Sequence, residues 1–449
     1  MWLVITINYN PALRGKLREI TPKANYNFLI FQSFNFLISS SIMKYEIKTI
    51  AWIQTIFAPM EDANSTTIEI MCRAGSIYET KENNGISHFL EHLFFKWGKK
   101  YPTPKSVAEA VDKFGGEFNA YTADEYAGYY VKCAPEFVHQ AIDVLSDMML
   151  NPIFPKEELE REKWVVIQEL KMYEDNPMAM AMQKWQNYYF WENSYGRPTI
   201  GTEENIKSFT QEMLFDHKTD LYAKDNLIIT VAGKISDPTA VENQLSLLFK
   251  DLPQTKRLQK PAFPNALPHE KISFFDQKNE QNHLIISAPG VKGDDERKYA
   301  ASILATILGG NMSSRLFQNI REKQGLCYYI KGMHLASEDT WVFLIRAGID
   351  KQRFDFGVEK IFEEIERIAN GDITQEEFEN AIGYNEGQIQ MGIESSDEMA
   401  SFLGSQYLIY HKVETLEDIL KKYKKLTLQD IKDIAGMIKR ENCYLFYIK

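Results

Sequence analysis

Two segments of this chain resemble each other, and this repeat is the strongest constraint on its fold. Residues 157–181 align without gaps with residues 376–400, and both begin with an acidic pair and end with Met-Ala. An internal duplication is the simplest explanation. The alternative is that two amphipathic helices of similar composition happen to match. A duplicated chain would fold into two copies of one arrangement.

A proline-rich stretch separates the two copies. Residues 251–270 contain four prolines, Pro253, Pro261, Pro264 and Pro268. So many prolines disfavour both a helix and a central strand, so we expect an extended linker here. We therefore predict one domain over residues 43–250 and a second domain over residues 271–449. A length of 449 residues suits such a division.

The first 42 residues differ from the rest of the chain. They are basic, and their apolar stretch is interrupted by polar residues and too short to span a bilayer, so no stable membrane insertion is expected. We expect residues 1–42 to be an extension that is disordered or not native, with the functional protein beginning at Met43. An organellar transit peptide is the alternative.

Strand and helix patterns alternate along the first copy. Residues 66–73 read as a strand, and Ser87 is the expected cap of a helix that runs towards Trp97. Further helices are expected over residues 104–114, 135–150 and 156–173, and strands over residues 117–133. This alternation predicts an α+β fold or a mixed sandwich. The chain has no glycine-rich phosphate loop, which disfavours a doubly wound nucleotide fold.

The run His88-Phe89-Leu90-Glu91-His92 lies within one of these predicted helices. On a helix, His88 and His92 lie one turn apart on the same face, so both imidazoles can bind one ion while Glu91 lies beside them. The pattern H-x-x-E-H is typical of inverzincin metalloproteases. The alternative is a coincidental surface histidine pair, so a third ligand is needed.

Glu169 is the best candidate for the third ligand. A catalytic zinc ion usually takes three protein ligands and leaves a fourth position for water. Glu162 lies two helical turns before Glu169 on the same face, so one carboxylate can bind the metal while the other orients a ligand. Each glutamate alone would more often face solvent.

The second copy lacks this ligand set. Gln388 aligns with Glu169, Ala381 aligns with Glu162, and residues 301–311 contain neither histidine nor glutamate. A copy of the fold without the metal site suggests a substrate-binding role for the second domain.

Composition excludes some other functions. The net charge of -11 disfavours nucleic-acid binding, which usually needs a basic surface. Cys72, Cys133, Cys327 and Cys443 are widely spaced and form no C-x-x-C pair. This spacing favours a reducing compartment, and we expect a cytoplasmic protein.

Four motifs carry a family resemblance. They are HFLEH at 88–92, GGEFNAYT at 115–122, EREKWVVIQELKMYEDNP at 160–177 and SSRLFQNIREKQGLCYY at 313–329. Over residues 43–449 the chain resembles the insulinase/pitrilysin-type metallopeptidases, family M16, and in particular their short two-domain branch that includes the processing peptidases. The resemblance implies two homologous domains, each a mostly antiparallel sheet with helices.

The same resemblance implies roles for individual residues. His88, His92 and Glu169 would bind one zinc ion per chain, Glu91 would be the catalytic base, and Glu162 would support the ligands. Arg321 and Tyr328 of the second domain would contact the substrate near the zinc. Because Tyr329 is adjacent to Tyr328, which of the two rings points inwards stays open.

The resemblance also implies substrates and partners. A peptide would add as a strand along Asn119, Ala120 and Tyr121, and backbone pairing of this kind has little sequence preference. Two domains form only half of the family's closed chamber, so we expect a homodimer. The alternatives are a non-catalytic structural or assembly subunit of this family, and a zinc hydrolase that acts on something other than peptides.

Overall fold

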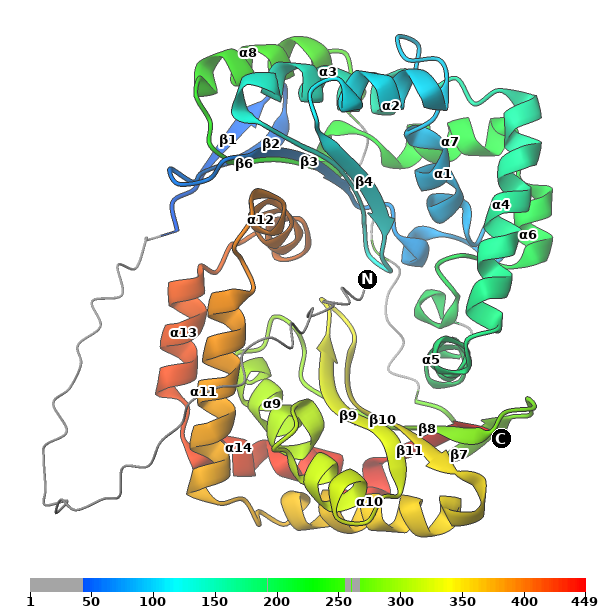
Figure 1. Cartoon of the computed structure of the whole chain (residues 1–449), viewed down its shortest axis with the longest axis vertical. Coiled ribbons are helices and arrows are strands. Elements are labelled where there is room, and N and C mark those ends of the chain that lie inside the picture. Colours follow the sequence, from blue (N-terminus) through cyan, green and yellow to red (C-terminus); the bar gives the residue numbers. More distant parts are fainter. Residues whose placement is uncertain (1–42, 192, 255–259, 261–266) are drawn as a thin grey trace, which may run out of the picture. The chain divides into compact units, whose positions relative to one another are not determined.

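Runs of β-branched and aromatic residues form two β-sheets in the computed structural model (Figure 1). The structure describes residues 43–191, 193–254, 260 and 267–449. Helices accompany both sheets, which confirms the predicted α+β class. The expected extension over residues 1–42 lies outside the described residues, as does most of the linker, residues 255–259 and 261–266.

The first sheet has six strands in the order β1-β2-β6-β3-β5-β4. They are β1 (Glu46–Ile50), β2 (Ile53–Pro59), β3 (Thr66–Cys72), β4 (Glu117–Thr122), β5 (Ala127–Cys133) and β6 (Leu227–Gly233). Neighbouring strands are antiparallel except for the parallel pair β2 and β6. Strand β4 therefore lies at one edge of this sheet, where a backbone can accept a further strand.

The helices of the first half are, in chain order, α1 (Ile86–Phe94), α2 (Pro104–Asp112), α3 (Val138–Leu150), α4 (Lys156–Glu174), α5 (Pro177–Phe190), α6 (Glu203–Ser208), α7 (Gln211–Leu221) and α8 (Pro238–Phe249). Helix α1 buries Phe89, Leu90 and Leu93 in one core with Ile68 and Ile70 of β3. The histidines of α1 lie on its less buried side. The predicted helix over residues 156–173 matches α4.

The second sheet has five strands in the order β7-β11-β8-β10-β9. They are β7 (Ile272–Phe275), β8 (Gln281–Pro289), β9 (Cys327–Ala336), β10 (Trp341–Asp350) and β11 (Tyr444–Ile448). The helices of this half are α9 (Lys298–Ala305), α10 (Phe354–Ala369), α11 (Gln375–Met391), α12 (Ser396–Tyr410), α13 (Leu416–Lys425) and α14 (Leu428–Ala435).

The two sheets share one topology. In the first sheet β6 is parallel to β2 and antiparallel to β3, and in the second sheet β11 is parallel to β7 and antiparallel to β8. The hairpins β4–β5 and β9–β10 complete the two sheets in the same order. The aligned residues 157–181 and 376–400 both run through a long helix into a second helix, α4 to α5 and α11 to α12. This correspondence supports the internal duplication.

Each half extends one helix onto the sheet of the other half (Figure 1). Helix α5 of the first half packs on the second sheet, where Trp185 Nε1 donates a hydrogen bond of 3.0 Å to Ser287 Oγ. Helix α12 of the second half packs on β3 and β6 of the first sheet, and its Leu403 belongs to the same apolar cluster as Met71. The described residues therefore form one compact unit in which the halves exchange helices.

As a result, strand β3 lies between the helices of the first half on one side and α12 on the other. All seven of its residues are buried, with Ile68 and Ile70 facing the helices of the first half and Met71 facing α12. Within the described residues, no helix is both long enough and apolar enough to cross a membrane.

Candidate metal centre

A glycine and a buried carboxylate begin helix α1. Gly85 precedes the helix with a φ of 97°, a left-handed conformation that favours glycine. The Glu79 carboxylate accepts hydrogen bonds from the backbone N–H groups of Gly85 (2.7 Å) and Ser87 (2.8 Å). The prediction that Ser87 caps the helix is wrong, because α1 begins one residue earlier and the Ser87 hydroxyl contacts His217 Nε2 at 2.9 Å. The helix also ends at Phe94, before the predicted Trp97.

Helix α1 presents His88 and His92 to Glu169 of α4. His92 Nε2 lies 3.1 Å from Glu169 Oε2, and His88 Nε2 lies 3.8 Å from the same oxygen. One ligand atom from each of the three residues lies within 4.8 Å of the other two. The structure therefore brings together the three predicted metal ligands, from two helices that are far apart in sequence.

Glu162 lies behind the ligands on the same helix as Glu169. One of its oxygens lies 2.9 Å from His92 Nδ1, and the other accepts a hydrogen bond from Lys96 Nζ. A carboxylate in this position fixes the ring orientation of a ligand histidine. Glu162 is therefore placed where it can orient His92, and its supporting role stays a prediction. Unlike Nδ1 of His92, the buried Nδ1 of His88 has no hydrogen-bond partner among the described residues.

Burial and the neighbouring charged groups separate the pKa values of the two histidines. Burial, together with the neighbouring His92, lowers the pKa of His88 below its ordinary value. Burial also opposes protonation of His92, but hydrogen bonds to Glu162 and Glu169 outweigh this effect and raise the pKa of His92 to about 9. The hydrogen bond from His92 in turn lowers the pKa of Glu169. A bound cation would take the place of the proton on His92.

Glu91 is held by a residue of the edge strand. Thr122 Oγ1, at the end of β4, donates a hydrogen bond of 2.8 Å to Glu91 Oε2. Burial raises the pKa of Glu91 above its ordinary value, although this hydrogen bond opposes the shift. A carboxylate with a raised pKa suits a general base near neutral pH. The role of the Thr122 side chain could not be predicted from the sequence, because its contact with Glu91 depends on the packing of α1 against β4.

A cleft of about 500 Å³ opens beside these residues. It is lined by His88, Glu91, Ala120, Tyr121, Thr122, Glu169, Tyr173, Ala179, Met182, Gln183, Gln186, Pro198, Thr199 and Ile200. Metal-cluster residues, strand β4 and helix α5 therefore border one space. Of the predicted substrate strand, Ala120 and Tyr121 line the cleft, whereas Asn119 does not.

The donor set suits a zinc ion. Two imidazole nitrogens and one carboxylate oxygen are a common ligand set of catalytic zinc, which keeps a fourth position for water. The three side chains are between 13% and 24% exposed, so an ion held there would also face the cleft. Glu162 behind His92 supplies the supporting carboxylate that such sites use.

Arg321 and Tyr328 lie together in the second half. Arg321 belongs to a π-helical segment, Phe317–Glu322, and its guanidinium lies 5.9 Å from the Tyr328 ring centroid. Tyr328 is 77% exposed, whereas Tyr329 is partly buried and its hydroxyl lies 3.0 Å from His283 Nδ1. Neither Arg321 nor Tyr328 lines the metal cleft in the described part of the chain. Their predicted role at the substrate stays a prediction.

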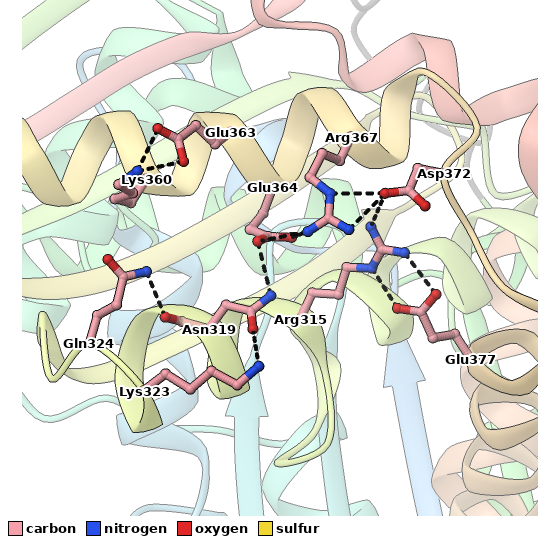
Figure 2. A network of polar contacts seen from close by, with 10 residues as sticks. All are labelled: Arg315, Asn319, Lys323, Gln324, Lys360, Glu363, Glu364, Arg367, Asp372 and Glu377. Carbon is pink, nitrogen blue, oxygen red and sulfur yellow. Dashed lines mark hydrogen bonds and ion pairs between the residues drawn. The ribbon is translucent and has the colours of Figure 1, made fainter.

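Polar contacts fix the segment that carries Arg321 (Figure 2). Arg315, just before it, pairs with Glu377 at the start of α11 and lies 3.6 Å from Asp372. Within it, Asn319 donates a hydrogen bond of 2.9 Å to Glu364 of α10. These contacts hold the segment against two helices of its own half.

Comparisons with known protein families match both halves of the chain. Residues 56–203 match the family described as insulinase (peptidase family M16), and residues 208–383 match the peptidase M16 inactive domain. The first match contains the metal cluster, and the second contains Arg321 and Tyr328.

Curated relatives match most of the chain. An uncharacterized zinc protease of Bacillus subtilis, YmxG, is 34% identical over 386 residues, which cover 86% of this chain and 93% of the relative. An uncharacterized zinc protease of Rickettsia bellii is 33% identical over 380 residues, with coverages of 84% and 91%.

Two solved structures share the fold. A protease from Helicobacter pylori superposes with a TM-score of 0.82 at 21% identity, covering 91% of this chain and 99% of the other. A peptidase M16 inactive domain from Pseudomonas fluorescens gives 0.83 at 18% identity, with coverages of 90% and 98%. At these identities the likeness concerns the fold alone.

Proposed function

Because this chain belongs to the insulinase family, peptidase family M16, we propose that it is a zinc-dependent endopeptidase that hydrolyses short or unfolded peptides in a chamber formed by dimerisation. The observation that carries the proposal is the convergence of His88, His92 and Glu169 beside a cleft that His88, Glu91 and Glu169 line. These four residues supply a metal site and a base together.

His88, His92 and Glu169 would hold one zinc ion per chain, and Glu162 would orient His92. When bound, zinc supplies Lewis acidity, which lowers the pKa of a water molecule and polarises the scissile carbonyl. Glu91 accepts the proton of the attacking water and can pass it to the leaving amine. Thr122 holds the Glu91 carboxylate towards the cleft through its hydrogen bond.

The peptide would bind as an added strand along the free edge of β4. Backbone groups of Asn119, Ala120 and Tyr121 would supply the pairing, which suits substrates of varied sequence. Arg321 and Tyr328 would contact the same peptide in the closed chamber, where a tyrosine hydroxyl can donate to a developing oxyanion.

We propose a homodimer, since one chain carries both the metal cluster and the Arg321 and Tyr328 pair. Sedimentation or light scattering of the active protein should give the mass of two chains. An active monomer would contradict this part of the proposal. We also propose a cytoplasmic location, which the four buried, unpaired cysteines support.

Zinc content and peptide cleavage test the proposal together. The purified chain should contain about one zinc ion, cut an unstructured peptide at sites read by mass spectrometry, spare a folded protein, and lose activity with a chelator. Glu169→Gln should lose both zinc and activity. Glu157→Gln, an exposed change on the same helix, is the matched control and should keep both. A chain with neither zinc nor cleavage would instead support the non-catalytic subunit.

A further inference from the structure

Hydrogen bonds near both ends of helix α12 join it to one face of β3 and to the residues that flank this strand. Ser396 Oγ lies 2.8 Å from the hydroxyls of both Ser65 and Thr67, and Arg73 donates hydrogen bonds to the carbonyl oxygens of Leu408 and Ile409. Alternate residues of a strand point to the same face, so these contacts follow one side of β3. Glu69 lies on that side, midway between Ser65 and Arg73.

Glu69 is a buried carboxylate with two partners from different elements. Tyr121 Oη of β4 donates a hydrogen bond of 2.7 Å to Glu69 Oε1, and Ser401 Oγ of α12 donates one of 2.9 Å to Glu69 Oε2. The residue is only 1% exposed. A buried carboxylate is costly unless it is hydrogen-bonded, so both partners stabilise this position.

A glycine makes room for Tyr121 to reach Glu69. Tyr121 pairs with Gly128 of β5, and β5 lies between β4 and β3. A Cβ atom at Gly128 would lie 2.3 Å from Cζ of the Tyr121 ring, closer than atoms can approach. The ring therefore lies across the backbone of β5, and its hydroxyl reaches the strand beyond.

Consecutive residues thus hold the end of β4 from its two faces. Thr122 contacts Glu91 on the side of α1, and Tyr121 contacts Glu69 on the side of α12. Strand β4 has a paired neighbour on one side only, so its backbone needs such contacts to keep one position beside the cleft.

We propose that Glu69 is a positioning residue for peptide binding, which fixes β4 through Tyr121 and ties it to α12 through Ser401. The inference rests on the proposed function, because β4 is the strand on which the peptide would pair. Small displacements of a positioning element weaken binding or reaction strongly. The edge of β4 then presents its backbone groups in register only while Glu69 holds Tyr121.

Peptide affinity in a Glu91→Gln parent tests this inference, because that parent binds peptide without consuming it. The probe is a fluorescent unstructured peptide that the wild-type chain cleaves. Tyr121→Phe removes only the hydroxyl, and Glu69→Leu removes both acceptors. We expect each variant to raise the Kd for the peptide about fivefold to tenfold. The double variant should bind the peptide no more weakly than either single variant.

Two further variants separate positioning from general damage. Glu69→Gln keeps an oxygen that can accept from Tyr121 and a nitrogen that can donate to Ser401, so it should restore Kd to within about twofold of the parent. Ser396→Ala removes another contact between β3 and α12 and should also leave Kd within about twofold. Zinc content should stay at about one ion per chain throughout.

Unchanged affinity in both Tyr121→Phe and Glu69→Leu would overturn the inference alone. An equal loss in Ser396→Ala would also overturn it, because docking of α12 in general would then be responsible. A parent that binds neither zinc nor peptide would overturn the proposed function and this inference with it.

Discussion

Glu91 is the residue whose replacement should separate metal binding from turnover. It contacts Thr122 and lines the cleft but is not one of the three clustered ligands. Glu91→Gln should therefore keep about one zinc ion per chain and lose roughly 10²-fold to 10⁴-fold in kcat, because no base takes the proton of the attacking water. Metal analysis and peptide cleavage by the same preparation check both halves of the expectation. A wild-type rate would contradict the role of Glu91.

The charge of Glu69 should make stability depend on pH. Burial raises the pKa of Glu69 from 4.5 to about 7, although the bonds from Tyr121 and Ser401 oppose the shift. The nearby Asp397 adds to it, and Asp397 itself pairs with Lys132 at 2.7 Å. The folded chain therefore binds more protons here than the unfolded chain. The resulting stability is fully present below about pH 4.5 and is lost as pH rises through 7.

Urea unfolding of the wild-type chain and Glu69→Gln at pH 5 and pH 8 checks this prediction. The neutral glutamine has no charge to bury, so the variant should not lose stability as the wild-type chain does. From pH 5 to pH 8, the free energy of unfolding of the variant should rise relative to that of wild type by on the order of 1–3 kcal/mol. Glu61→Gln, at an exposed carboxylate, should show no such gain. A constant difference between wild type and Glu69→Gln would contradict the prediction.

At the scale of single elements, helix α1 depends on Glu79. Its carboxylate accepts three hydrogen bonds at the start of the helix, from Gly85, Ser87 and Asn84 Nδ2. Glu79→Gln replaces one acceptor oxygen by a donor, which leaves at least one buried N–H without a partner and should cost about 1–3 kcal/mol of stability. Because α1 carries His88 and His92, zinc affinity should fall as well.

Thermal unfolding and a zinc titration measure the two effects of Glu79→Gln. Glu82→Gln changes an exposed carboxylate in the same loop and should stay within about 0.5 kcal/mol of wild type. Equal behaviour of the two variants would show that Glu79 does not hold the start of the helix.

The sequence predicted the helices that carry the candidate metal ligands, but it predicted less well the residues at which these helices begin and end. The period of an α-helix was enough to place His88 and His92 on one face of their helix. The same period placed Glu162 and Glu169 on one face of another helix. The cap of α1 could not be predicted in this way. Glu79 lies in the loop before the helix, and only the folded path of the chain brings its carboxylate to Gly85.

At the scale of the whole molecule, the sequence indicated two copies but not how they fit together. The aligned segments predicted equivalent helices, and α4 with α5 corresponds to α11 with α12. An apolar helix face shows that something covers it and does not show which sheet does so. Trp185 and Leu403 therefore gave no sign that α5 and α12 would each pack on the sheet of the other half.

This exchange of helices predicts that the halves remain together when the connection between them is cut. Leu403 packs in one apolar cluster with Met71 and Ile228 of the first sheet, and Trp185 packs in another with Leu344 of the second. Separation would expose both clusters to water, which is unfavourable in proportion to the apolar area exposed.

A protease site that replaces residues 255–259 provides a place to cut the connection between the halves. After cleavage the two fragments should co-elute in size-exclusion chromatography and keep their zinc, because both clusters stay buried. Met71→Asp together with Leu344→Asp places charges in the two clusters and should release the fragments, whereas the exposed pair Glu61→Asp and Glu157→Asp should not. Fragments of the otherwise unchanged chain that separate on cleavage, each soluble and folded, would show that the exchanged helices do not hold the halves together.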